Sequence, residues 1–330
     1  MNTSNQRKHQ LARLPQTVAL TLACMGQFWI AGASSAMGLM LQPSISQCGI
    51  QAPTSTAPPA TAQQRLPNSQ AVRGQRDVLW AWLGSATARY PHTALGSPVH
   101  AASLHALVSA PSGMPREVVY RLPLHRVFED RVPRLADLDG DGRDEIILVE
   151  SDAIRGAALV VFGLRPTSQP GGATESAADT ALLEVARGPY AGAPLRWLNP
   201  VGVADFDGDG RLDVASVTTP HVGGLLTLHH FRPPRLAPYA TAMDVSNHRM
   251  GEREQQLAVT VEQPGHRPTI IVPDMQLRAL HALRWDAPGQ WKELAELLPL
   301  PARVERITPI AGGGCLLLAN ATWWRVTVTP

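Results

Sequence analysis

One unit recurs along this chain, and it consists of an apolar run, a short polar break and a second apolar run. The breaks are separated by 69, 53 and 46 residues and lie at Asp152, His221, Asp274 and Asn320. Short runs rich in Val, Ile and Leu that are joined at turn residues are typical of β-hairpins. The segments are EIILVESDAIRGAALVVFGL (145–164), DVASVTTPHVGGLLTLHHF (213–231), TIIVPDMQLRALHALRW (269–285) and CLLLANATWWRVTV (315–328), and a weaker copy is LHALVSAPSGMPREVVYRL (104–122). We therefore expect the chain to bury its apolar residues by stacking repeated hairpins.

The length of the repeat indicates the architecture, because a period of roughly 50 residues is the size of one four-stranded propeller blade. The sequence predicts an all-β fold, a β-propeller of about five blades, with six or seven as alternatives and a β-sandwich as the competing architecture. The last copy ends after two strands at Pro330, and strand-like residues at 78–94 precede the first copy. A ring closed by strands from both ends of the chain would account for this. Only Trp291–Leu298 has helical spacing.

Two acidic loops, Asp137–Glu145 and Asp205–Asp213, directly precede the first two strong hairpin segments. Both fit the pattern D-x-D-G-D-G-x-x-[DE]. Carboxylates at the first, third, fifth and ninth positions converge when the chain turns tightly, and the two glycines permit the backbone dihedrals of such a turn. The predicted ligands are these carboxylates and the carbonyl group at the seventh position, namely Asp137, Asp139, Asp141, Arg143 and Glu145 in the first acidic loop and Asp205, Asp207, Asp209, Arg211 and Asp213 in the second.

Charge repulsion argues that each acidic loop holds a cation. Two carboxylates about 4 Å apart repel by roughly 1 kcal/mol in water and by about 4 kcal/mol at a surface-like dielectric, so four of them would push the loop open. A ligand set made only of oxygens disfavours zinc and copper. Calcium takes about six to eight oxygens, whereas magnesium tolerates crowded all-protein cages poorly. The sequence therefore predicts two Ca²⁺ sites.

An EF-hand is the competing acidic motif, and it requires a Glu at the twelfth loop position. Leu148 and Ser216 stand there, inside apolar runs. The segment that aligns with a third loop, Thr260–Gly265, keeps one carboxylate, and the fourth equivalent, Thr308–Gly312, has none. We expect no calcium at these two later segments.

The acidic loops resemble the calcium loops of FG-GAP/VCBS repeats, whose family fold is the integrin-α-type β-propeller. The match is specific over 130–165 and 198–232 and degenerate over 240–285 and 300–328. The wider pattern, with RYPHTALG (89–96), RWLNPVGVADFDGDG (196–210) and VSNHRMGERE (245–254), is similar to a group of secreted bacterial FG-GAP/VCBS repeat proteins. The resemblance implies extracytoplasmic location, structural calcium and a role in adhesion or ligand binding, but no single activity.

The first 36 residues have the order of an export signal. Basic residues at positions 7, 8 and 13 precede an apolar stretch from Val18 to about Ile30, and Ala31–Ala33 fits a small-residue cleavage site. The apolar stretch is shorter than the ~20 residues that a spanning helix needs, which favours cleavage over a retained anchor. Cys24 allows a lipoprotein alternative, although Thr21 stands where such signals favour Leu. We expect a periplasmic or secreted protein without a transmembrane segment after cleavage.

Residues 37–75 are rich in Pro, Ala, Ser, Thr and Gln and show no apolar periodicity, which predicts a flexible tether before a propeller over 76–330. Cleavage of the signal would leave Cys48 and Cys315. The two cysteines could form a disulfide in an oxidising compartment. Cys48 lies in the predicted tether, however, and Cys315 in a predicted buried strand, so two free thiols remain the alternative.

Two sets of residues outside the acidic loops are candidates for a ligand site. The break residues Asp152, His221, Asp274 and Asn320 should lie on the face opposite the acidic loops and could line a ligand face, although turn chemistry also explains them. His92, His221 and His248 stand beside turn signals and could converge as a metal or acid/base cluster, although their separations match no metal motif.

The sequence favours binding over catalysis. The formal net charge is +2 and the basic residues are scattered, which argues against a nucleic-acid partner. The chain contains no G-x-S-x-G, phosphate-binding loop or H-E-x-x-H motif. We predict an exported, calcium-stabilised binding or scaffold module for a protein or glycan, without catalysis. The alternatives are a structural partner of a membrane assembly and a periplasmic lyase or hydrolase acting on polysaccharide, which clustering of the three histidines would favour.

Overall fold

The computed structural model describes residues 38–48, 57–109, 113–166, 180–287 and 289–329. These residues form β-strands, connecting loops and one short 3-10 helix (Ala60–Gln64), as the predicted all-β class requires. In the described ranges, no helix is long and apolar enough to span a membrane. The predicted export signal and Cys24 lie outside the described residues.

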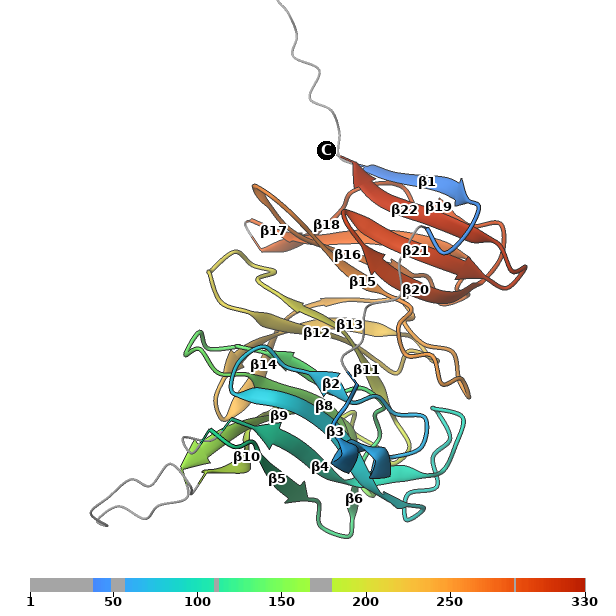
Figure 1. Ribbon diagram of the computed structural model, residues 1–330. Helices are drawn as coiled ribbons and strands as arrows, with labels where there is room; N and C mark the ends of the chain where they lie inside the picture. Colours follow the sequence, from blue (N-terminus) through green and yellow to red (C-terminus); the bar gives the residue numbers. More distant parts are fainter. Residues whose placement is uncertain (1–37, 49–56, 110–112, 167–179, 288, 330) are drawn as a thin grey trace, which may run out of the picture. The chain divides into compact units, whose positions relative to one another are not determined.

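Most strands belong to five antiparallel units of four strands each, which we number along the chain (Figure 1). In units 1 to 4 the strands follow one another in sequence order. The strands are β2 (Val72–Arg73), β3 (Val78–Thr87), β4 (His100–Val108) and β5 (Arg116–Arg121) in unit 1; β7 (Arg134–Ala136), β8 (Glu145–Asp152), β9 (Gly156–Pro166) and β10 (Thr180–Arg187) in unit 2; β11 (Leu198–Ala204), β12 (Asp213–Thr218), β13 (Leu225–Arg232) and β14 (Arg235–Ala242) in unit 3; β15 (Val259–Gln263), β16 (His266–Pro273), β17 (Ala279–Asp286) and β18 (Gln290–Glu293) in unit 4; and β20 (Val304–Ile310), β21 (Gly313–Leu318), β22 (Trp323–Thr329) and β1 (Gly38–Ser44) in unit 5.

Hydrogen bonds link the first three units into one open sheet. The short strand β6 (Arg126–Phe128) pairs with both β4 and β8, and β10 meets β14 in parallel at the pair Arg187 and Arg235. Units 4 and 5 form separate sheets, and none of the sheets closes on itself.

Each of the five predicted apolar segments supplies two successive strands that pair antiparallel, namely β4 with β5, β8 with β9, β12 with β13, β16 with β17, and β21 with β22. The helical spacing at Trp291–Leu298 was misleading. This run contributes to β18 and to β19 (Leu298–Pro299), and both pair with β17. An apolar period over so few residues is too short to stabilise a helix, and the edge of β17 offers backbone hydrogen bonds instead.

Each unit packs its apolar face on the next unit along the chain. Four buried clusters lie between units 1 and 2, 2 and 3, 3 and 4, and 4 and 5. Strands between two such clusters are covered on both faces, which is why all eight residues of β8 are buried and why its sequence is a continuous apolar run rather than an alternating one. The described residues form no comparable cluster between units 5 and 1.

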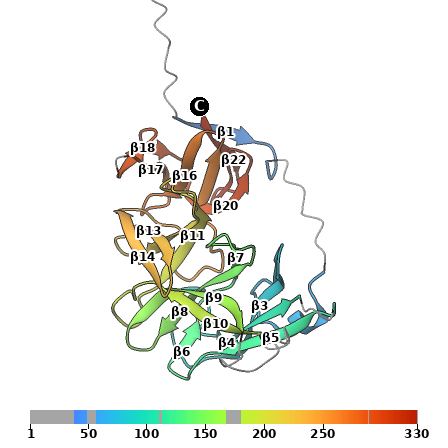
Figure 2. The same ribbon diagram turned by 90° about the vertical axis from the view of Figure 1, so that its left-hand side faces the viewer.

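The described residues of the expected flexible tether over 37–75 include paired strands, β1 and β2. β1 pairs with β22 from Gly38 and Thr329 to Ser44 and Trp323, and it completes unit 5 (Figure 2). Without β1, the outer edge of β22 would expose unpaired backbone groups. Leu39 and Leu41 also pack against the cluster between units 4 and 5. The segment 78–94, expected to help close a ring, instead supplies β3 of unit 1.

A disulfide joins Cys48 to Cys315, so the two cysteines are not free thiols. It ties the residues just after β1 to β21, and both cysteines are buried. A disulfide is compatible with a periplasmic or secreted location, where oxidising conditions allow the bond to persist.

Candidate functional site

The two acidic loops occupy equivalent places in units 2 and 3. The first joins β7 to β8 and the second joins β11 to β12, and the last carboxylate of each loop is the first residue of the following strand. Gly140 and Gly142 have φ angles of 76° and 85°, and Gly208 and Gly210 have 74° and 87°. Other residues rarely adopt these positive angles, so the glycines allow both loops to turn alike.

The first acidic loop brings three carboxylates together at the start of β8. Ligand atoms of Asp137, Asp139 and Glu145 all lie within 4.8 Å of one another. Glu145 is fully buried, and burial raises its pKa to about 7. Oδ1 of Asp137 and Oε1 of Glu145 are buried and have no hydrogen-bond partner. The nearest cation to Glu145 Oε1 is a guanidinium nitrogen of Arg165, 3.6 Å away.

The second acidic loop groups its carboxylates in the same way, but the hydrogen-bond partners of these carboxylates differ from those in the first loop. Ligand atoms of Asp205, Asp207 and Asp213 lie within 4.8 Å of one another. Asp213 is buried, which raises its pKa to about 6, and its Oδ2 accepts a hydrogen bond of 2.8 Å from the hydroxyl of Tyr239. Nε2 of His230 lies 2.9 Å from Oδ2 of Asp207. These neighbours give the second loop local hydrogen-bond donors.

The remaining predicted ligands stabilise the turns. Oδ1 of Asp141 accepts the backbone amide of Arg143, and Oδ1 of Asp209 accepts that of Arg211, each at 2.8 Å. Asp209 also forms a second acidic group with Asp207 and His230. His230 was not predicted as a ligand, since it lies on β13, the second strand of the hairpin, and reaches the loop only because β12 pairs with β13 and sets His230 opposite Asp213.

Both acidic loops could therefore hold a metal ion. Carboxylate oxygens dominate the ligand sets, and such sets suit hard cations. The equivalent turns of units 4 and 5, between β15 and β16 and between β20 and β21, contain no comparable group in the described part of the chain.

The four break residues lie in equivalent turns, but only one of them lines a cavity among those described. Asp274 accepts the backbone amides of Arg278 and Ala279, and Asn320 accepts the hydroxyl of Thr322. Turn hydrogen bonds of this kind explain both residues. His221 is the break residue that reaches a cavity.

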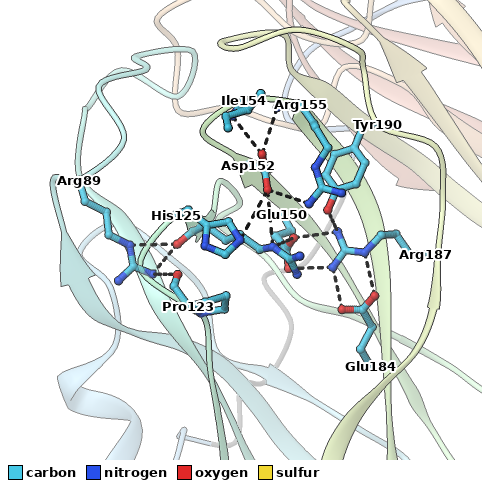
Figure 3. Close-up of polar contacts among 11 residues, drawn as sticks. Arg89, Pro123, His125, Glu150, Asp152, Ile154, Arg155, Glu184, Arg187 and Tyr190 are labelled. Atoms are coloured by element: carbon cyan, nitrogen blue, oxygen red, sulfur yellow. Dashed lines mark hydrogen bonds and ion pairs between the residues drawn. The ribbon is translucent and has the colours of Figure 1, made fainter.

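Asp152 belongs to a network of arginines and acids (Figure 3). Burial disfavours its charged form, yet hydrogen bonds from the Arg155 side chain and from the amides of Ile154 and Arg155 hold the pKa of Asp152 below its ordinary value. Glu150, fully buried beside it, accepts both terminal nitrogens of Arg187, at 2.7 and 3.0 Å, and Arg187 also binds Glu184. Arg126 lies 3.6 Å from both Glu150 and Asp152, so three arginines face the three acids within the protein, which supports a structural role.

A cavity of about 410 Å³ brings two of the three predicted histidines together, with the third hydrogen-bonded to one of them. Leu195 and Thr219 in its wall have φ angles of 60° and 48°, which are unusual for residues other than glycine. Unfavourable backbone angles of this kind concentrate at functional sites. The lining residues of this histidine cavity are His92, Leu195, Arg196, Trp197, Thr219, His221, Val222 and Met250.

His92 is oriented by a buried carboxylate. Its Nδ1 lies 2.6 Å from Oε1 of Glu129, whose other oxygen accepts the hydroxyl of Ser151 at 2.6 Å. Nδ1 therefore carries a proton, and Nε2 is the nitrogen left for the cavity. The sequence gave no signal for Glu129 or Ser151, because Glu129 is 37 residues from His92 along the chain and Ser151 is 22 residues from Glu129, so only the fold brings them together.

His221 and His248 form a hydrogen-bonded pair, and both rings contact the ring of Trp197. The carbonyl of Glu252 accepts a hydrogen bond from Nε2 of His248, so Nδ1 of His248 accepts one from Nε2 of His221, at 2.8 Å. Burial lowers the pKa of His221 to about 4 and that of His248 to about 3. Both rings are therefore neutral at pH 7, and Nδ1 of His221 keeps its lone pair.

The comparisons with known proteins include a distant likeness to a solved structure. No protein-family model matches the chain, and no curated protein matches it. The chain is similar to a crystal structure of rhamnogalacturonan lyase YesW, with 15% sequence identity and a TM-score of 0.30. The match covers 58% of this chain and 41% of the lyase, so it spans well under half the length of that protein. We base no conclusion about function on a likeness this distant.

Proposed function

We propose that this chain is an exported, calcium-stabilised β-propeller of the FG-GAP/VCBS type, which acts as a binding or scaffold module for a protein or glycan without catalysis. The five units of four strands, stacked face to face in chain order, support the propeller. The completion of unit 5 by β1 supports it too, since strands from both ends of the chain share one sheet. The disulfide is compatible with export.

The observation that carries the calcium proposal is the pair of buried carboxylate oxygens in the first acidic loop that lack hydrogen-bond partners, on Asp137 and Glu145. A buried charged oxygen without a partner is costly, and a bound cation removes that cost. The residues that would hold the ion are Asp137, Asp139 and Glu145 in the first loop and Asp205, Asp207 and Asp213 in the second, with Asp141, Asp209 and the carbonyls of Arg143 and Arg211 as further ligands. Calcium would neutralise these acids where successive strands meet.

Calcium removal tests the proposal. A ligand that binds only the folded state raises its stability, so the melting temperature should be higher in calcium than in EGTA. Extracellular sites of this kind bind at roughly 10⁻⁴–10⁻³ M. With calcium about tenfold to a hundredfold above Kd, each site should add about 1.4 to 2.7 kcal/mol.

Two matched double variants locate the effect. Asp139→Ala/Asp207→Ala should lose most of the calcium response, whereas Asp286→Ala/Glu296→Ala, which removes two acids outside the loops, should keep it. Equal melting temperatures of the parent protein with calcium and with EGTA would contradict the proposal.

The histidine cavity favours a second candidate, an enzyme acting on polysaccharide. His92 has the arrangement of a general base, with one nitrogen held by Glu129 and the other left for the cavity. Glycan cleavage by the purified protein that His92→Gln abolishes, while the melting temperature stays unchanged, would establish this alternative. Absence of cleavage across neutral and acidic polysaccharides would contradict the enzyme and favour the binding module.

A further inference from the structure

A second cavity, of about 540 Å³, lies where residues from unit 5 meet segments that precede units 1, 2 and 4. Its walls come from the residues just before β2, from the start of unit 2, from the connection before β15, and from β20. We call it the arginine cavity. It is lined by Asn68, Gln70, Arg131, Val132, Arg134, Arg253, Glu254, Gln255, Gln256, Arg306, Ile307, Thr308 and Pro309.

The arginine cavity concentrates positive charge. Four arginines and one acid line it, although the whole chain carries a net charge of only +2. Two of the arginines have carboxylate partners, because Arg134 contacts Asp130 at 2.7 Å and Arg306 contacts Glu254 at 2.6 Å. The described residues provide no carboxylate within ion-pair distance of the other two, Arg131 and Arg253.

Arg131 is the informative member, because it is 4% exposed. Its terminal nitrogens donate to the backbone carbonyls of Pro67 and Leu95, and its Nε has no hydrogen-bond partner. Burial and the positive charge of Arg253 lower the pKa of Arg131, and the negative charge of the neighbouring Asp130, which is paired with Arg134, offsets this lowering only in part. A buried guanidinium without a neutralising partner is unfavourable, and an anion in the cavity would remove part of that cost.

The chemistry of the walls narrows the class of anion. A guanidinium group is planar and binds a carboxylate through paired hydrogen bonds. In the described part of the chain, the side chains of Gln70 and Thr308 line the cavity without a hydrogen-bond partner, which leaves them available to hydroxyl groups. The cavity volume lies within the range of small-ligand sites. The four contacts between consecutive units are apolar, so a polar cavity here is not a packing requirement.

We propose that the arginine cavity binds the carboxylate of an acidic sugar, with Arg131 and Arg253 facing the charge and the polar side chains contacting the ring hydroxyls. This inference rests on the binding role proposed above and names the ligand class for it.

Titration calorimetry of the purified chain with glucuronate, and with glucose as the neutral control, tests the proposal. Glucuronate should bind, and glucose, which lacks the carboxylate, should bind at least tenfold more weakly. Inorganic phosphate serves as the small-anion control. Binding of phosphate alone, or of glucose as tightly as glucuronate, would overturn the acidic-sugar assignment, as would the absence of glucuronate binding.

Two variants place the site. Arg253→Gln removes an exposed guanidinium whose one hydrogen bond in the described structure, to Asn68, is 3.4 Å long, so the fold should persist. It should weaken glucuronate binding about tenfold, as the loss of one charge-assisted hydrogen bond implies. Arg278→Gln removes another exposed arginine that lies outside the cavity and should leave binding unchanged. Equal affinities of these two variants would place the ligand elsewhere.

The calcium response separates this proposal from the previous one. The arginine cavity contains none of the predicted calcium ligands. A chain that calcium stabilises but that ignores glucuronate would overturn the ligand assignment and keep the propeller proposal. A chain that binds glucuronate and has the same melting temperature in calcium and in EGTA would keep the ligand assignment and overturn the calcium proposal.

Discussion

The two acidic loops have the same sequence pattern and the same backbone, yet they differ in how their carboxylates are partnered. In the first, buried oxygens of Asp137 and Glu145 have no hydrogen-bond donor. In the second, Tyr239 donates to Asp213, and His230 lies within hydrogen-bond distance of Asp207. His230 and Tyr239 also stack, with ring centroids 4.0 Å apart, so each holds the other in place.

This difference shows that a shared motif does not fix a shared dependence on a cation. Donors from β13 and β14 stabilise part of the negative charge of the second loop. The first loop relies instead on Arg165 at 3.6 Å and on Arg76, whose Nε lies 3.5 Å from Asp137. Arg76 is largely exposed, and exposed ion pairs contribute little. We therefore expect the first loop to depend more strongly on calcium.

The largest expected effect comes from neutralising the last carboxylate of each loop. In calcium, Glu145→Gln should lose about 1.4 to 2.7 kcal/mol of stability, the full contribution of one site, and Asp213→Asn should lose less. Denaturant unfolding with calcium and with EGTA measures both values. In EGTA, Glu145→Gln should equal or exceed the parent in stability, because the variant no longer buries an ionisable carboxyl group. A greater calcium-dependent loss of stability in Asp213→Asn than in Glu145→Gln would contradict the expectation that the first loop depends more strongly on calcium.

The next effect is a pH dependence of the calcium response. Burial raises the pKa of Glu145 to about 7 and that of Asp213 to about 6, above their ordinary values of 4.5 and 3.8. Without calcium, the folded state therefore holds more protons than the unfolded state between these values, and stability should fall as pH rises through this window.

Calcium binds the ionised carboxylates, so it should raise the melting temperature more at about pH 7.5 than at about pH 5. The upper part of this difference, near pH 7, belongs to Glu145 and should disappear in Glu145→Gln. Thermal melts at both pH values, with and without calcium, measure it. A calcium response that is larger at the lower pH would show that the buried carboxyl groups are not ligands.

The smallest expected effect concerns the hydrogen bond that Tyr239 donates to Asp213 of the second loop. Tyr239→Phe removes the hydroxyl that donates to Asp213 and keeps the ring on His230. The variant should lose about 1 kcal/mol in EGTA and less in calcium, because the ion replaces the lost donor. Tyr120→Phe is the matched control, since the ring of Tyr120 packs against Phe162 rather than against His230. Equal losses with and without calcium would mean that Tyr239 acts only through packing.

Local patterns predicted the hairpins and the form of the acidic loops, and longer-range features escaped them. The helical spacing at Trp291–Leu298 did not produce a helix, since the free edge of β17 outweighs a weak local preference. The predicted tether differed for a related reason, because the edge of β22 recruits Gly38–Ser44 as β1. Neither edge can be recognised from composition, because its position depends on which strands are already paired.

The sequence by itself determined where the chain forms hairpins and where its carboxylates converge, because strand periodicity and loop spacing act between residues close in the chain. Tertiary structure alone decided the remaining features. It paired Cys48 with Cys315, 267 residues apart, placed Glu129 against His92, and gathered Arg131, Arg253 and Arg306 around one cavity. Such contacts arise only after the sheets stack, since side chains from distant segments then share one volume and one electrostatic environment.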